Sequence, residues 1–241
     1  MESAFILMIS TLILVVAPDV KAEFPINKTN CGVTKYCISE PADCDPEGNS
    51  TCLFGSLRLL SQTPPNGINL HNELSGNSSG YIALGLTPAS GGNTTLYICA
   101  KNNSNNGSIF FTVMSLNSAN STSPPTLLNM TMPMFSGNVT SDKIQCVFNI
   151  SNLNATATTR STPDTMFSIK LGTGSVDSNG NIGPFTASKS TGPLDLANLL
   201  NSTVNATTAP TTTMSAATSV MPYHAALILL SILGVFVLGM A

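Results

Sequence analysis

Three observations predict an all-β fold, an antiparallel β-sandwich. From Cys52 onward the chain is a series of short apolar runs divided by Asn, Gly, Ser and Pro, the composition of strands joined by turns. No stretch shows a helical period of useful length. In the stretch 80–100 (GYIALGLTPASGGNTTLYICA), Ile82, Leu84 and Leu86 alternate with other residues, the period-2 pattern of a strand. We interpret this stretch as a core strand, an exposed loop over 87–92 and a partner strand fixed by a disulfide.

The remaining elements follow the same logic along the chain. Residues 23–51 are polar and rich in Cys, Pro and Gly, which predicts a disulfide-tied segment with little regular structure, packed against the following domain. Strands are expected over 53–60, 67–74, 80–87, 94–101, 108–116, 126–132, 143–150 and 165–171. Two of them have clear sidedness, with Ile144, Cys146, Phe148 and Ile150 facing in on one and Phe167, Ile169 and Leu171 on the other. Asn149 then faces outward.

The cysteines predict three disulfides. They are even in number and lie within the part of the chain expected to be secreted, a combination that favours disulfides over free thiols. Cys31, Cys37, Cys44 and Cys52 are expected to pair among themselves, whereas Cys99 and Cys146 are expected to pair across the core. No Cys-x-x-Cys pair occurs, so a zinc site is not expected.

The two ends carry targeting signals. The apolar run 4–17, followed by Val20 and Ala22 at the −3 and −1 positions, predicts a signal peptide over 1–22. A buried N-terminal helix is the alternative. Near the other end, Ser215-Ala216-Ala217, a short spacer and the apolar run 225–241 predict attachment of a glycosylphosphatidylinositol (GPI) anchor at Ser215 and removal of 216–241. A tail-anchored or single-pass protein is the alternative. The expected domain spans 23–200, and the Thr- and Ser-rich residues 201–215 form a stalk.

The composition predicts a heavily glycosylated surface outside the cell. Charged residues are 9% of the chain and the net charge is −3, whereas soluble domains average about 25% charged residues. N-glycosylation is expected at the Asn-x-Ser/Thr sites Asn27, Asn49, Asn77, Asn93, Asn102, Asn106, Asn120, Asn129, Asn138, Asn149, Asn154, Asn201 and Asn205. There is no basic patch in the sequence, so nucleic acid is not an expected partner.

Three groups of residues are candidates for chemical sites. His71 has no acid or nucleophile at a readable spacing, so a surface histidine is favoured over a catalytic one. Met130, Met132 and Met134 alternate and could offer thioethers to Cu(I), but packing at an edge strand beside Pro133 is the simpler interpretation. The acidic residues Glu40, Asp43, Asp45 and Glu47 could hold calcium, or lie in a solvated loop among the cysteines. No catalytic, cofactor-binding or metal-ligating residue is therefore assigned.

Several motifs, taken in order, resemble the DOMON domain of ferric-chelate-reductase-like proteins. They are CGVTKYC at 31–37, Cys44-Asp45-Pro46 with Cys52, GYIALGL at 80–86, Tyr97-Ile98-Cys99, IQCVF at 144–148 and the Leu171-Gly172-Thr173-Gly174 turn. The resemblance covers 31–200 and implies an immunoglobulin-like β-sandwich. Larger members continue into a transmembrane cytochrome that carries haem and reduces ferric complexes. This chain is interpreted as a single-domain form without that cytochrome.

The resemblance also bears on cofactors. Some DOMON domains bind haem b through a Met shortly after the strand that corresponds to 80–86 and through a His further on. The corresponding segments here are 87–92 (TPASGG) and 181–187 (NIGPFTA), which contain neither residue. The expected function is therefore a GPI-anchored, non-catalytic surface module that carries no cofactor and binds an extracellular protein or small ligand. A haem- or metal-binding redox domain is the alternative.

Overall fold

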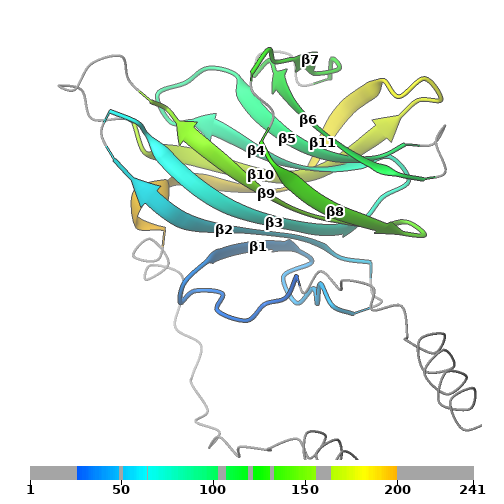
Figure 1. The fold of residues 1–241 in the computed structure, drawn as a ribbon, viewed down its shortest axis with the longest axis horizontal. Coiled ribbons are helices and arrows are strands. Elements are labelled where there is room, and N and C mark those ends of the chain that lie inside the picture. Colours follow the sequence, from blue (N-terminus) through cyan, green and yellow to red (C-terminus); the bar gives the residue numbers. More distant parts are fainter. Residues whose placement is uncertain are drawn as a thin grey trace, which may run out of the picture. The chain divides into compact units, whose positions relative to one another are not determined.

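Two antiparallel sheets make up the fold (Figure 1). The computed structural model of the chain describes residues 26–48, 51–63, 65–102, 107–118, 122–130, 133–155 and 164–199. The chain divides into two compact units, residues 1–205 and 206–241, and all described residues belong to the first. The signal peptide, the stalk, the anchor site and the C-terminal run lie outside the described residues, and their assignments stay predictions.

The first sheet has the order β1-β2-β3-β9-β8 and the second has the order β11-β10-β4-β5-β6-β7. The first consists of β1 (Tyr36–Glu40), β2 (Leu53–Gln62), β3 (Ile68–Asn77), β9 (Lys143–Leu153) and β8 (Phe135–Thr140). The second consists of β11 (Ile182–Asp195), β10 (Met166–Val176), β4 (Tyr81–Pro88), β5 (Thr94–Lys101), β6 (Ile109–Leu116) and β7 (Thr126–Leu127), and a short 3-10 helix, η1 (Leu196–Asn198), follows β11. The predicted all-β, immunoglobulin-like sandwich is confirmed.

The main core lies between the two sheets and is joined covalently. Tyr97 on β5 stacks on Phe148 of β9, with ring centroids 5.7 Å apart. Cys99 on β5 and Cys146 on β9 form the disulfide that the sequence analysis expected across the core, and both residues are fully buried. The inward faces expected for β9 and β10 are those that the structure buries. Because the disulfide lies in the middle of the core, the two sheets are held at their centre.

The central hairpin β4–β5 is buried on both faces. Residues 81–86 are all inaccessible to solvent, and the loop 89–93 is exposed. The outer face of β4 is covered because the β10–β11 hairpin folds over it and contributes Val176 and Phe185 to a second apolar cluster. Tyr81 in this cluster donates a hydrogen bond from its hydroxyl to the carbonyl oxygen of Gly183, 3.1 Å away. The strand that the period-2 pattern predicts over 80–87 is therefore fully buried from 81 to 86, in the middle of its sheet.

The N-terminal segment is held by two short-range disulfides, Cys31–Cys37 and Cys44–Cys52. Figure 1 shows this segment in blue beside the first sheet, where it packs a third apolar cluster of Ile26, Cys44, Cys52 and Phe54. The expectation of little regular structure was wrong for residues 36–40, which form β1 and pair with residues 53–57 of β2. Composition did not predict this strand, because the surrounding segment is polar. The strand is stabilised by backbone pairing with β2.

Three other expectations need correction. The strand expected over 126–132 is limited to β7, two residues that pair with β6. Strand β8 begins at Phe135, just after the methionine run, and was not predicted. Strand β11 was also missed, because its Gly, Pro, Ser and Thr residues resemble a loop. Prolines are tolerated there since β11 is the edge of the second sheet.

Candidate functional site

The acidic residues considered for calcium are engaged separately. Glu40 forms an exposed ion pair with Lys189, and Asp45 accepts a hydrogen bond from the backbone of Glu47. Within the described ranges, no three His, Cys, Asp or Glu side chains gather closely enough to hold a metal ion. The acidic cluster therefore supports no calcium site among the residues the structure describes.

The methionine run forms the rim of a cavity beside β9. Met130, Pro133 and Met134 line a cavity of about 590 Å³ together with Tyr97 and the end of β9, Asn149–Asn152. Met134 is 88% exposed. Met132 lies outside the described residues, so the structure does not test whether three thioethers converge on one point.

The segments that would ligate haem in the resembling family do not fit that group. Residues 87–92 end β4 and form the loop to β5, where the hydroxyl of Thr87 hydrogen-bonds that of Thr94. Residues 182–187 form the start of β11, and Tyr81 is hydrogen-bonded to Gly183 there. Axial ligation of a b-type haem needs side chains such as His or Met, and neither segment has one. His71 lines a different cavity from Met130 and Met134.

Another group of residues does converge, on the outer face of the first sheet. The hairpin register places Arg58 of β2 directly opposite His71 of β3, and His71 directly opposite Asn149 of β9. Directly paired residues of neighbouring strands share a face, so these three side chains form one row across the sheet. The imidazole Nδ1 of His71 lies 2.8 Å from Oδ1 of Asn149. Since an amide oxygen only accepts, Nδ1 is the donor in this pair.

The adjacent row contains a mostly buried ion pair. Nζ of Lys35 lies 2.7 Å from Oε2 of Glu73, and the two side chains are 10% and 17% exposed. The same carboxylate oxygen accepts a hydrogen bond from the hydroxyl of Ser56 at 2.7 Å. Lys35 also donates to the backbone carbonyl of Asn27 at 2.9 Å. This network fixes the N-terminal segment to the sheet through β3.

The N-terminal segment forms the wall of the resulting pocket. The carbonyl oxygen of Asn30 accepts hydrogen bonds from the amides of Val33, Thr34 and Lys35, which closes a tight loop within the Cys31–Cys37 disulfide. The cavity measures about 310 Å³, and its lining residues are Asn27, Thr29, Asn30, Thr34, Lys35, Arg58, His71 and Glu73. Every lining side chain can donate or accept a hydrogen bond. We call it the Arg58 pocket.

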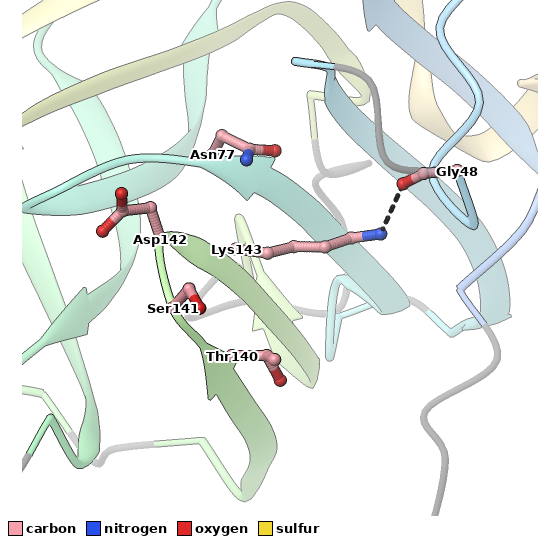
Figure 2. Close-up of a pocket in the computed structure, with 6 residues that line it drawn as sticks. All are labelled: Gly48, Asn77, Thr140, Ser141, Asp142 and Lys143. Atoms are coloured by element: carbon pink, nitrogen blue, oxygen red, sulfur yellow. Dashed lines mark hydrogen bonds between the residues drawn. The ribbon is translucent and has the colours of Figure 1, made fainter.

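A second polar hollow lies at the β8–β9 turn (Figure 2). It is bordered by Thr140, Ser141, Asp142, Lys143, Asn77 and Gly48. Figure 2 shows the Lys143 side chain extending from β9 to the carbonyl oxygen of Gly48, which accepts a hydrogen bond from Nζ at 3.1 Å. Its charge is thus directed at the N-terminal segment. Asp142 is paired with Lys101 at 3.4 Å. These contacts tie the turn to its surroundings and give it a structural role.

The described glycosylation sequons are all accessible to some degree. Asn77, Asn93, Asn129, Asn138, Asn149 and Asn154 are exposed, and Asn27 and Asn102 are half-buried. Asn49, Asn106, Asn120, Asn201 and Asn205 lie outside the described residues. Asn27 lines the Arg58 pocket, and Asn149 holds its histidine. Glycans at these two positions would therefore border the pocket.

Sequence patterns alone did not indicate this pocket. His71 was expected at the surface, and no role was expected for Arg58, Lys35 or Glu73. One signal was available, because the chain has two arginines and two histidines and one of each falls in the neighbouring strands expected over 53–60 and 67–74. Pairing those strands as a hairpin would have brought Arg58 and His71 together.

The part of the chain that the structure describes contains no helix of the length and apolarity needed to span a membrane.

Comparison with characterised proteins gives partial matches to ferric-chelate reductases. The chain is 36% identical over 98 residues to "Putative ferric-chelate reductase 1" of Danio rerio, which covers 40% of this chain and 16% of that protein. It is 34% identical over 93 residues to the protein of the same name in Xenopus laevis, covering 38% and 15%. Against "Ferric-chelate reductase 1" of Homo sapiens it is 35% identical over 63 residues, covering 26% and 10%.

The matched stretch is thus about a sixth of the length of the first two relatives. No protein-family model matches the chain. No solved structure matches it either. The similarity to ferric-chelate reductases is consistent with a DOMON-like region.

Proposed function

We propose that this chain is an extracellular, GPI-anchored glycoprotein whose DOMON-type sandwich binds a ligand or partner without catalysing a reaction on it. The Arg58 pocket carries the proposal. It is a polar hollow on a face stiffened by two disulfides, and its hydrogen-bonding side chains come from three separate parts of the chain. Small-molecule sites are typically concave and largely pre-formed.

The ferric-chelate reductase relatives support the DOMON part of the proposal. Their similarity covers up to 40% of this chain, and the motif order noted in the sequence agrees with it. The Ser215-Ala216-Ala217 site, the short spacer and the following apolar run support the anchor. The signal-peptide pattern and the accessible sequons support the extracellular location.

The chemistry of the pocket favours binding over catalysis. A hydrolytic site would need a nucleophile within hydrogen-bond reach of a base. The Ser56 hydroxyl lies 2.7 Å from the Glu73 carboxylate, but Ser56 is buried and does not line the Arg58 pocket, and Glu73 is paired with Lys35. Nδ1 of His71 is directed at the Asn149 amide. The alternative, a haem- or metal-binding redox domain, takes its support from the names of the relatives. The residues at the family's haem positions disfavour it.

The experiment uses the full chain expressed in secreting cells. Phosphatidylinositol-specific phospholipase C is expected to release the protein from the cell surface. The mature protein is expected to lack a tag placed after Ala241, because the tag leaves with residues 216–241 when the anchor is attached. A protein that stays bound and keeps the tag is a single-pass protein instead. The released protein is then examined by absorption spectroscopy after incubation with hemin. A stoichiometric Soret band would replace the binding-module proposal with the redox alternative.

A further inference from the structure

We propose that the Arg58 pocket binds a hydroxylated carboxylic acid with a single negative charge, such as a sugar acid. This inference rests on the binding function proposed above and adds the class of ligand. It follows from three properties of the pocket, namely its charge, its neutral hydrogen-bonding groups and its rigidity.

The charge of the pocket comes to one positive unit. Lys35 and Glu73 neutralise each other at 2.7 Å. Arg58 remains, since it forms no ion pair with any carboxylate in the described ranges. Its guanidinium presents a planar fork of donors that matches a carboxylate with two parallel hydrogen bonds. The carboxylate of Glu73 in the same pocket would repel the second charge of a dianion, so a monoanion is the better match.

The neutral groups are suited to hydroxyls. With Nδ1 of His71 engaged by Asn149, the second ring nitrogen, Nε2, is left to hydrogen-bond a ligand hydroxyl. Lys35 and Ser56 both donate to Oε2 of the Glu73 carboxylate, which leaves Oε1 as a second acceptor. The hydroxyls of Thr29 and Thr34 and the Asn30 amide complete the lining. A ligand that carried only a carboxylate would leave these groups unused.

The pocket is also rigid and small. The Cys31–Cys37 disulfide, the three amides bonded to the Asn30 carbonyl and the contact of Lys35 with the Asn27 carbonyl all hold its wall. The wall of the pocket therefore loses little conformational entropy on binding. The volume of about 310 Å³ lies at the lower end of the range for ligand sites and suits one six-carbon hydroxy acid.

The test compares three probes on the full chain solubilised in mild detergent. Glucuronate carries both the carboxylate and the hydroxyls, glucose lacks the carboxylate and acetate lacks the hydroxyls. Isothermal titration or ligand-observed NMR is expected to show the tightest binding for glucuronate. Arg58→Gln is expected to weaken glucuronate binding roughly 10- to 100-fold, the range for a hydrogen bond to a charged group, while leaving the weak binding of glucose unchanged.

The matched control is Lys189→Gln, which removes the same charge from β11 of the second sheet, where Lys189 forms an exposed pair with Glu40 of β1. It is expected to leave glucuronate binding unaltered, whereas His71→Ala weakens glucuronate and not acetate. Treatment with sialidase before titration separates two sources of the ligand. Binding that appears only after treatment assigns the pocket to a sugar acid carried by the protein's own glycans, for which Asn27 and Asn149 are the bordering sites.

Equal affinity for glucuronate and acetate would overturn the hydroxy-acid assignment, and so would binding that survives Arg58→Gln. Absence of glucuronate binding before and after sialidase treatment, in protein with native circular dichroism, would also overturn it. In that case a spectrum without a Soret band leaves the binding-module function standing with another ligand. A Soret band removes the proposed function whatever the titration shows.

Discussion

Removal of the disulfide between the two sheets is expected to cost more stability than removal of either N-terminal disulfide. Cys99 and Cys146 are 47 residues apart in sequence, and both are fully buried. In the chain-entropy model a loop of this length contributes about 4 kcal/mol. The double substitution Cys99→Ala/Cys146→Ala also leaves a void where two sulfur atoms packed, which adds roughly 1 kcal/mol for each. The expected total loss is therefore about 6 kcal/mol.

The control is Cys31→Ala/Cys37→Ala, because these cysteines are 6 residues apart and the same model gives about 2 kcal/mol. Both variants are compared with the wild type by urea unfolding. The chain contains no tryptophan, so far-ultraviolet circular dichroism is the suitable probe. The slope is fitted separately for each variant, since removing a cross-link changes the surface exposed on unfolding. Equal losses in the two variants would show that loop length does not govern the contribution of these disulfides.

Three further predictions concern the same domain. Lys35→Met is expected to lower the free energy of unfolding by about 2–4 kcal/mol, since it leaves the Glu73 carboxylate without its cation in a mostly buried site, and Lys35→Met/Glu73→Leu should recover most of that loss in chemical denaturation. Gly174→Ala is expected to cost about 1–3 kcal/mol because its Cβ would overlap the Tyr81 ring, whereas Gly192→Ala, which meets no atom, should be close to neutral in thermal unfolding. The side-chain amide and backbone of Asn181 hold the pKa of Asp177 below its ordinary value of 3.8, so the carboxylate stabilises the fold above that pH and the contribution is lost as the pH falls through the lower folded value. The stability difference between wild type and Asp177→Asn should therefore shrink as unfolding is measured from pH 5 down to pH 2, and a difference that grows would contradict this assignment.

Sequence patterns predicted the strands in which large apolar residues alternate with other residues. Alternation of large apolar residues placed β4, β5, β9 and β10 within a few residues of their observed bounds. It failed for β1, β8 and β11, which contain few such alternations and are all edge strands. Their pairing depends on backbone hydrogen bonds to a neighbour, and composition carries little information about that.

The Arg58 pocket illustrates the same limit for function. Two of its residues, Arg58 and His71, come together through the register of a single hairpin, which the predicted strands 53–60 and 67–74 nearly specified. Lys35 could not be placed, because the path of the N-terminal segment across the sheet depends on tertiary packing around Phe54. The pairing of Cys99 with Cys146 was predictable since the other four cysteines are close neighbours in sequence.

The strand order has a consequence for how the chain is made. Strand β3 pairs with β9, which follows β4 to β8 in the chain, so the inner edge of β3 has no partner until residues 143–153 have left the ribosome. The N-terminal disulfides can close within the first 52 residues, whereas Cys99 has to wait for Cys146. During this interval the apolar face of β2 and β3 is uncovered, which is the kind of surface that aggregates or recruits chaperones. A glycan added to Asn77, at the end of β3, would be in place before that face is covered, and it would therefore protect the growing chain before it serves the finished one.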